Sequence, residues 1–434
     1  MDRELFSRKA LLFLVIFFIA ACGGGETFKN ESGPKEGADA NRWESKKIIE
    51  VEDAGGILSP RVKAYPGKNG GIHLAYFSGK PNEYFVRYAF LDPVPGNPVV
   101  SEIVVKADNS SGVSLAVDTN DIPAIAYQAG EVREAGQPGQ SDAMFSLKNT
   151  QWREYTAGIG FVSRNPVFKD GLAGSSLSTA FDSKGNLHMV YQFRYEGIDA
   201  LNYAYPDLLY IKKNRNGLGV DVSEETVEGN IFTPGGGATL QNNIGDFCTI
   251  SMDNNDLPVA FYYAETVNLA QTGLKVAYKR NGTWVSKWIE DKVKIGGISK
   301  ARLDKNGNLA VAYFVKESQD GEKNFLRYAY QNSPDEWKVQ MVDDSIHGGR
   351  YPSLSFDSSG KPAIAYYAEM TYGGRELQDL RLARFNGTAW KHEEVATSGN
   401  AGLYNNLMFD EEDNPLIVSY SGTQKAIFLY SFNP

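Results

Sequence analysis

The chain has 434 residues, a formal net charge of -9 at pH 7 and no run of basic residues, so its composition argues against nucleic acid as a partner. It contains two cysteines, Cys22 and Cys248. If the first is modified, no disulfide is available, and a hydrophobic core of several hundred residues must provide the stability.

Residues 1–21 have the pattern of a secretory signal peptide. Basic residues between Arg3 and Lys9 precede an apolar run from Ala10 to Ala21. This run is too short for a membrane span of about 20 residues and is typical of a signal-peptide core. The segment Ile19 to Cys22 resembles the bacterial lipobox. The resemblance implies that diacylglycerol is attached to Cys22, and the following Gly23 implies sorting to the outer membrane. Whether the protein faces the periplasm or the cell surface stays open.

Residues 22–40 are rich in Gly, Lys and Glu and contain almost nothing apolar. Such a segment cannot offset the entropy of ordering, so we expect a flexible tether from the lipidated Cys22. The remaining residues, 41–434, are expected to form one folded domain.

A strand, a tight turn and a second strand recur along this domain. In each copy a turn residue precedes the end of an apolar strand by nine positions, and successive copies are roughly 50 to 70 residues apart. We call each copy a repeat unit, and there are seven: Gly67 with Tyr76, Asp118 with Tyr127, Asp182 with Tyr191, Asp253 with Tyr262, Asp304 with Tyr313, Asp357 with Tyr366, and Asp410 with Ser419.

Each unit continues with a third strand, a turn such as Asn281-Gly282, and a fourth strand that opens with tryptophan, as at Trp390. The seventh unit stops after its third strand. The N-terminal segment 41–52 carries Trp43 where the sixth unit has Trp390. We therefore predict an all-β fold, a seven-bladed β-propeller in which an N-terminal strand completes the last blade.

The D-x-x-[GD]-x-P-x-[IV]-A-Y repeats resemble those of bacterial secreted propeller lipoproteins and, more distantly, sialidase-like propellers. The sialidase turn signature S-x-D-x-G-x-x-W is absent. The resemblance implies a blade and specifies no chemistry, because one fold hosts many functions.

Strand order places the connections from second to third strand and from fourth to first strand on one face of the propeller. These connections are long and varied, for example residues 129–143, 193–207, 264–273 and 368–379, whereas the Asp turns on the other face are short. Binding residues concentrate on long loops of a rigid scaffold. We therefore expect the ligand on the long-loop face.

Aromatic and charged residues on that face are the candidate ligand-binding residues. Aromatic rings beside carboxylates suit sugars, and tyrosine with arginine also suits a protein partner. The alternative is that these residues bind no ligand: the tyrosines pack between blades and the charged side chains are solvated. The candidates are Arg61, Arg194, Tyr263, Glu265, Arg350, Tyr351, Tyr367 and Glu369.

No catalytic set can be assembled from these residues. Glycoside hydrolysis, with Glu265 and Glu369 as the carboxylate pair, is the alternative function; the sialidase resemblance adds only Arg61 and Arg350. No zinc-spaced cluster or phosphate-binding loop is found, so no metal or cofactor is expected. Cys248 is expected to be a buried small residue. The sequence favours a monomeric, non-catalytic propeller that is lipid-anchored in the outer membrane and binds a protein or a polysaccharide.

Overall fold

The computed structural model describes residues 42–51, 61–80, 83–94, 96–107, 112–130, 141–158, 172–195, 198–205, 223–229, 243–265, 271–317, 323–333, 335–345, 348–372 and 375–434. The predicted signal peptide (1–21), the predicted lipidation site Cys22 and the predicted tether (22–40) lie outside the described residues. All described residues belong to one compact unit, Asp39–Pro434. Within these described ranges, no helix is long and apolar enough to cross a membrane.

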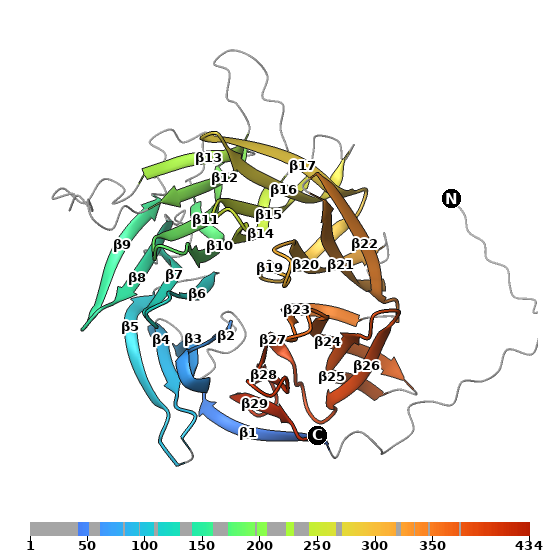
Figure 1. The fold of residues 1–434 in the computed structure, drawn as a ribbon. Helices are drawn as coiled ribbons and strands as arrows, with labels where there is room; N and C mark the ends of the chain where they lie inside the picture. The colour runs from blue at the N-terminus through green and yellow to red at the C-terminus, as the bar shows by residue number, and fades with distance from the viewer. Residues whose placement is uncertain are drawn as a thin grey trace, which may run out of the picture. The chain divides into compact units, whose positions relative to one another are not determined.

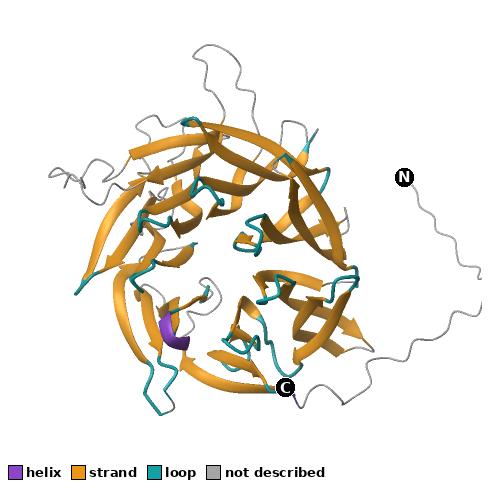
Figure 2. Ribbon diagram, viewed as in Figure 1, coloured by secondary structure: helices purple, strands orange, loops and turns teal. Residues whose placement is uncertain are grey.

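The compact unit is built from strands that pair antiparallel except at one position, and a short 3-10 helix, η2 (Lys68–Gly70), accompanies them (Figure 2). Four sheets have four strands each. Their strands are β1 (Trp43–Glu50), β29 (Ala426–Phe432), β28 (Pro415–Ser421) and β27 (Leu403–Phe409); β2 (Lys63–Pro66), β3 (Ile72–Lys80), β4 (Glu83–Leu91) and β5 (Val100–Ala107); β14 (Asn243–Met252), β15 (Pro258–Glu265), β16 (Thr272–Arg280) and β17 (Thr283–Asp291); β23 (Gly348–Phe356), β24 (Pro362–Tyr372), β25 (Arg375–Phe385) and β26 (Trp390–Ala396).

A fifth sheet has an interrupted first strand, and a sixth sheet has eight strands. The fifth contains β18 (Lys294–Ile298), β19 (Arg302–Leu303), β20 (Leu309–Glu317), β21 (Lys323–Ser333) and β22 (Glu336–Asp343). The sixth contains β6 (Val113–Val117), β7 (Pro123–Gly130), β8 (Ser141–Lys148), β9 (Trp152–Gly158), β10 (Leu172–Phe181), β11 (Leu187–Tyr195), β12 (Ile198–Tyr205) and β13 (Ser223–Gly229).

The sheets confirm the all-β propeller class and correct the predicted count of seven separate blades, because hydrogen bonding gives six sheets. The reason is local. Strands β8 and β10 pair in parallel at one position, Leu172 with Ser141, and this bridge joins the units of Asp118 and Asp182 into one eight-stranded sheet. The seven repeat units thus occupy six sheets. A repeat count in sequence could not reveal this contact between neighbouring units.

The N-terminal strand completes the last sheet, as predicted. Strand β1 pairs antiparallel with β29 from Trp43 opposite Phe432 to Glu50 opposite Ala426. Trp43 is 9% exposed and packs edge-on against Phe432, with ring centroids 5.4 Å apart. This pairing joins the two ends of the described chain and leaves no open edge between the first and last sheets.

The sheets stand in a ring, with the first strand of each repeat unit innermost and the fourth strand outermost (Figure 1). Strands β2, β6, β14 and β27 are among those at the centre, and β1, β5, β9, β17 and β26 are among those on the outside. The residues of the first strands therefore face a common axis, and this arrangement positions the candidate site.

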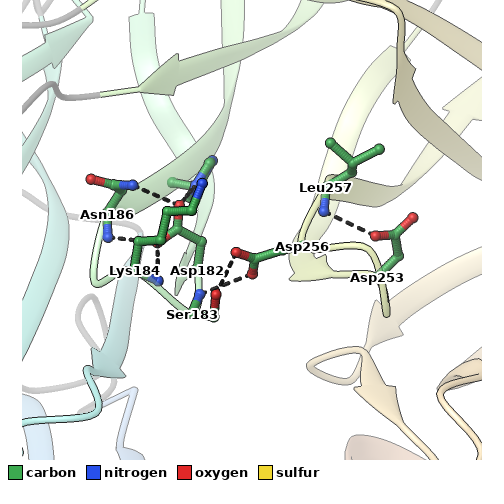
Figure 3. Close-up of polar contacts among 8 residues, drawn as sticks. Asp182, Ser183, Lys184, Asn186, Asp253, Asp256 and Leu257 are labelled. Atoms are coloured by element: carbon green, nitrogen blue, oxygen red, sulfur yellow. Dashed lines mark hydrogen bonds and ion pairs between the residues drawn. The ribbon is translucent and has the colours of Figure 1, made fainter.

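The Asp turns explain why the repeat is recognisable in sequence. In the turn between β10 and β11, Asp182 Oδ1 accepts the N–H groups of Lys184 (3.0 Å) and Asn186 (2.7 Å) (Figure 3). The carboxylate replaces the backbone acceptors that a tight turn lacks. Asp256, in the next unit, accepts both the N–H (2.9 Å) and the hydroxyl (2.7 Å) of Ser183. The turn face is therefore a chain of contacts between units.

Asp256 lies at a turn position that requires left-handed backbone. Its φ is 64°, and the equivalent residue in the preceding turn is Gly185, with φ of 82°. Asp121 and Asp413 repeat both the backbone conformation, with φ of 70° and 65°, and the contact with the preceding unit. Aspartate thus takes the place of glycine at turns where its side chain can accept a hydrogen bond from the preceding repeat unit.

Three of the tyrosines that end second strands link neighbouring units. Tyr262, Tyr313 and Tyr366 are completely buried. Their hydroxyl groups donate to carboxylates on the fourth strand of the preceding unit: Tyr262 to Glu228, Tyr313 to Glu290, and Tyr366 to Asp343. Tyr76 and Tyr127 differ, because their hydroxyl groups bond to Ser101 and Glu154 on the fourth strand of their own unit.

Replacing Trp43 tests the closure. Trp43→Ala removes a buried indole from the β1–β29 seam and should lower the free energy of unfolding by about 3 to 5 kcal/mol, measured by urea denaturation. Lys46→Ala, at an exposed position on the same strand, is the control and should leave the midpoint nearly unchanged. Equal midpoints for both variants would show that β1 does not close the ring.

Replacing Asp256 tests the contact between turns. Asp256→Gly keeps the left-handed backbone and loses only the bonds to Ser183, at a cost of about 1 kcal/mol. Asp256→Ala should cost about 1 kcal/mol more, because an alanine at φ of 64° is strained. Urea denaturation of the two variants measures both effects, and a more stable alanine variant would refute this account of the turn.

Candidate functional site

The inner strands enclose a cavity of about 370 Å³ on the propeller axis. Every repeat unit contributes to it. The residue six positions before the turn residue lines the cavity in all seven units, and we call these seven residues the mouth ring: Arg61, Gly112, Ser176, Phe247, Ile298, Tyr351 and Tyr404. First strands run from the predicted long-loop face toward the Asp turns, so the mouth ring lies toward the long-loop face.

Four residues of the mouth ring have left-handed backbone. Their φ values are 45° for Arg61, 53° for Phe247, 51° for Tyr351 and 58° for Tyr404. In β14, β23 and β27 the pairing register shifts at this position, which marks a β-bulge. A bulge turns a side chain away from its ordinary place in the pleat. Left-handed backbone at bulky residues is a strain that clusters at functional sites.

Glycines two positions before the bulge allow the strand to approach the neighbouring unit. At Gly349 (φ of 106°) and Gly402 (φ of 92°), an added Cβ would lie 3.0 Å from Leu326 and 3.0 Å from Leu380, respectively. These leucines belong to the third strand of the preceding unit. A side chain at either glycine would therefore push the bulge away from the ring.

Aromatic rings form one part of the cavity wall. The rings of Tyr351 and Tyr404 lie 4.6 Å apart, and the two hydroxyl groups are hydrogen-bonded. Burial, together with Tyr404, raises the pKa of Tyr351, so this phenol stays protonated. Phe247 is 37% exposed, which is unusual for a large apolar residue on an inner strand.

Two buried polar atoms in the cavity wall lack hydrogen-bond partners among the described residues. They are Nε of Arg61 and Oδ1 of Asn405. The amide nitrogen of Asn405 is occupied, because it donates to the carbonyl of Tyr351 (3.2 Å). Buried polar groups are nearly always hydrogen-bonded in folded proteins. An unpartnered donor and an unpartnered acceptor in one cavity suit a ligand with hydroxyl groups.

Cations dominate the charge of the cavity. Arg61 and Lys63 line it, and Asp246 is the one carboxylate among its described lining residues. Burial, followed by repulsion from Arg61, lowers the pKa of Lys63 from 10.5 to about 8. The Lys63 side chain keeps contact with solvent because it lines an open cavity that the inner strands surround. Among the described residues it has no ion-pair partner.

The structure brings some of the predicted candidates to the cavity and others behind its wall. Arg61 and Tyr351 line it directly. Tyr263 lies behind Phe247, with ring centroids 6.5 Å apart, and Tyr367 lies behind Tyr351, at 6.2 Å. Both supporting tyrosines are buried.

The remaining candidates have other partners. The Tyr263 hydroxyl donates to Glu265, and Arg350 forms an ion pair with Glu369 at 2.8 Å. Neither glutamate is among the lining residues of the cavity. The backbone of Arg194 pairs with Asp199 in the β11–β12 hairpin, and the side chain of Arg194 lies outside the described residues. The predicted carboxylate pair is therefore not presented to the cavity.

The expected loop segments 193–207 and 368–379 are mostly strand. Strands β11, β12, β24 and β25 extend through them as two hairpins. The connections of these two units are therefore shorter than the sequence suggested, because most of their residues pair within a hairpin.

Cys248 is buried, and burial raises the pKa of its thiol to about 12, which fits a core residue and no nucleophile. His73 and His188 are buried beside Asp121 and Asp182. Within the described part of the chain, no group of three or more histidine, cysteine or acidic side chains is placed to hold a metal ion.

Other hollows lie at the turn face and are lined mainly by turn residues. One of about 220 Å³ lies beside Asp253, and one of about 480 Å³ lies beside Asp410. Their polar residues belong to the turns whose hydrogen bonds hold the repeat together. The axial cavity differs because all seven repeat units contribute to it and two of its buried polar atoms, Arg61 Nε and Asn405 Oδ1, have no partner among the described residues.

No protein-family model and no curated protein matches this chain. Solved structures share its fold. An ulvan lyase of a new polysaccharide lyase family has a TM-score of 0.55 at 11% identity, with 90% of this chain and 96% of that chain covered. A protein of unknown function from Dyadobacter fermentans DSM 18053 has a TM-score of 0.47 at 10% identity, with 89% and 99% covered.

A mutant of NanB sialidase from Streptococcus pneumoniae has a TM-score of 0.44 at 12% identity, with 89% of this chain and 70% of that chain covered. At such identities the likeness shows the β-propeller fold alone. The function of this chain has to be argued from the cavity.

Sequence reasoning missed Phe247, Tyr404, Asn405 and Lys63. A signal was present: glycine, any residue, then a bulky residue recurs at a fixed distance before the turn residue, as in Gly245 to Phe247, Gly349 to Tyr351 and Gly402 to Tyr404. An alignment of the seven repeat units would have shown the mouth-ring residues at one equivalent position, six residues before each turn residue.

The titration of Lys63 gives a test by pH. Because its folded pKa of about 8 lies below the ordinary 10.5, the unfolded chain holds this proton where the folded chain has lost it. The free energy of unfolding should therefore rise between about pH 8 and pH 10.5. The stability advantage of Lys63→Ser over the parent, measured by urea denaturation, should shrink across this range. A difference that stays constant would place Lys63 in ordinary solvent.

Proposed function

We propose that this protein is a non-catalytic binding module for a saccharide, held at the outer membrane by a lipid on Cys22. The observation that carries the proposal is the axial cavity. The residues of its wall include Arg61 and Asn405, whose buried Nε and Oδ1 atoms have no partner among the described residues, and the aromatic residues Phe247, Tyr351 and Tyr404.

The chemistry of this wall suits a sugar. Aromatic faces can cover the apolar face of a sugar ring. A sugar hydroxyl can donate to Asn405 Oδ1, and a ring or hydroxyl oxygen can accept from Arg61 Nε. The volume of about 370 Å³ lies in the range of small-molecule pockets.

A protein ligand is less well supported, because the described exposed apolar side chains do not gather at the cavity. Phe247 is the exception. The others lie mainly on outer strands and turns, at Val100 and Ile103 of β5, Val285 of β17, and Val339 and Met341 of β22. A standard protein interface needs a larger continuous patch.

The lipid anchor and tether rest on sequence alone. A flexible segment of the length of residues 22–40 would span roughly 25 Å on average. This reach would let the propeller stand away from the membrane and present its long-loop face to envelope polysaccharide. It also makes a stable complex with the membrane surface unnecessary.

Glycoside hydrolysis is the second candidate, and one observation favours it. Asp246 is a carboxylate in the lining of the same cavity as Arg61, and glycosidases use carboxylates as general acid, general base or nucleophile. In a hydrolase, Asp246→Asn would abolish product formation. In a binding module, the glycan would be recovered intact.

A glycan-array screen of the unit Asp39–Pro434, followed by calorimetry on the bound glycans, tests the proposal. Phe247→Ala and Tyr404→Ala should each weaken binding about tenfold or more, because the loss of one well-packed ring costs about 1.4 kcal/mol or more. Mass spectrometry of the recovered glycan distinguishes binding from cleavage.

Leu257→Ala is the matched control, because Leu257 is an exposed apolar residue in an Asp turn on the other face. It should leave affinity unchanged, and so should the double variant Glu265→Gln, Glu369→Gln. A folded protein that binds no glycan on the array, or one whose binding is lost only in the glutamate variant, would overturn the proposal.

A further inference from the structure

A second ring of equivalent residues lies below the mouth ring. The residue four positions before each turn residue lines a narrow cavity of about 100 Å³ on the axis, and this residue is polar in every unit. We call these residues the throat ring: Lys63, Ser114, Ser178, Thr249, Lys300, Ser353 and Asn406. A polar residue in all seven inner strands has a structural reason.

Five members of the throat ring join neighbouring units. In each case the side-chain oxygen accepts a backbone N–H from the following unit. The donor is the residue directly after the throat-ring position of that unit. The pairs are Ser114 with Thr179 (3.0 Å), Ser178 with Ile250 (3.3 Å), Thr249 with Ala301 (3.3 Å), Ser353 with Leu407 (2.8 Å) and Asn406 with Ala64 (2.9 Å).

Lys63 and Lys300 break this rule. A protonated lysine has three donors and no acceptor, so it cannot take the N–H of the next unit. The equivalent N–H groups belong to Leu115 and Leu354. Lysine at these positions therefore gives up a contact that the fold uses elsewhere in the ring.

Neither lysine has a counter-charge among the described residues. None of the described residues that line the throat, or the hollow of about 230 Å³ beneath it, is acidic. Lys300 donates to the carbonyl of Leu115 (3.1 Å) and lies over the ring of Tyr65, 4.9 Å from its centroid. Arg302 adds a third cation beside the same ring.

The cations repel one another. Burial, followed by Arg302 and Lys63, lowers the pKa of Lys300, and burial likewise lowers the pKa of Arg302. Holding several cations together on the axis, with no carboxylate among their described neighbours, costs stability. Such an arrangement is typical of a site whose neutralising charge comes from a ligand.

We infer that Lys63 and Lys300, with Arg302 beneath them, form an anion-binding site in the throat of the propeller. The ligand group is a carboxylate, sulfate or phosphate. It is either the acidic group of a saccharide whose ring lies in the mouth cavity, which rests on the proposed function, or a free anion.

Calorimetry on the unit Asp39–Pro434 tests this with three probes: glucuronate, sodium sulfate and glucose. The double variant Lys63→Ser, Lys300→Ser removes the charge and restores the acceptor that the ring uses elsewhere, so it should fold and melt at an equal or higher temperature. It should bind glucuronate or sulfate at least tenfold more weakly than the parent.

Lys46→Ser, Lys338→Ser is the matched control. It makes the same change in formal charge at exposed positions on the outer strands β1 and β22, and anion affinity should be unchanged. A loss of equal size in this control would assign the effect to overall charge and overturn the inference. So would a parent protein that binds neither anion.

The outcomes also separate the throat site from the saccharide proposal. Sulfate binding that depends on the two lysines, together with an empty glycan array, would support a free-anion site and sink the saccharide proposal. Glucuronate binding without sulfate binding would support the acidic saccharide. Equal glycan binding by the parent and the lysine variant would support the mouth cavity as the saccharide site and overturn the inference of an anion site in the throat.

Discussion

The pairing of β1 with β29 is the interaction on which the rest of the structure depends. It joins Trp43 to Phe432 across almost the whole described chain. Once the ring is closed, the first strand of every repeat unit must face the same axis, so residues that are far apart in sequence become neighbours. Arg61, Phe247, Tyr351 and Tyr404 meet in one cavity for this reason alone. The closure thus creates the candidate site as well as protecting the edge strands.

The inner strands combine two tasks that conflict in chemistry. Serine, threonine and asparagine in the throat ring tie neighbouring units together by accepting backbone N–H groups. Lys63 and Lys300 give up that contact and introduce repelling charges. Left-handed backbone at Arg61 and Tyr351 adds strain above them. Departures from the most stable arrangement are expected at functional sites, where a protein sacrifices local stability for binding. Both rings depart from it on the same axis.

Much of the fold could be predicted from sequence because its signals are local. The spacing from Asp357 to Tyr366 reports a hairpin, and Trp43 matches Trp390 because both open a fourth strand. The bridge from Leu172 to Ser141, which merges two units, depends on a contact between units and left no local signal.

The residues of the candidate site were harder to predict from the sequence than the fold. Glu265 and Glu369 looked free in sequence but are occupied by Tyr263 and Arg350. Asn405 and Lys63 belong to no sequence motif. They could be recognised as candidate site residues only once the fold had brought the inner strands together around the axis.

Crystallography can test most directly whether a ligand binds on the propeller axis, in the mouth cavity and the throat below it. Crystals of the unit Asp39–Pro434 would be soaked in selenate, and anomalous diffraction would be measured at the selenium edge. Selenate is a tetrahedral dianion like sulfate, so the measurement locates an anion without knowledge of the natural ligand. We expect an anomalous peak on the axis between Lys63 and Lys300. An empty axis in crystals that show selenate elsewhere on the surface would contradict it.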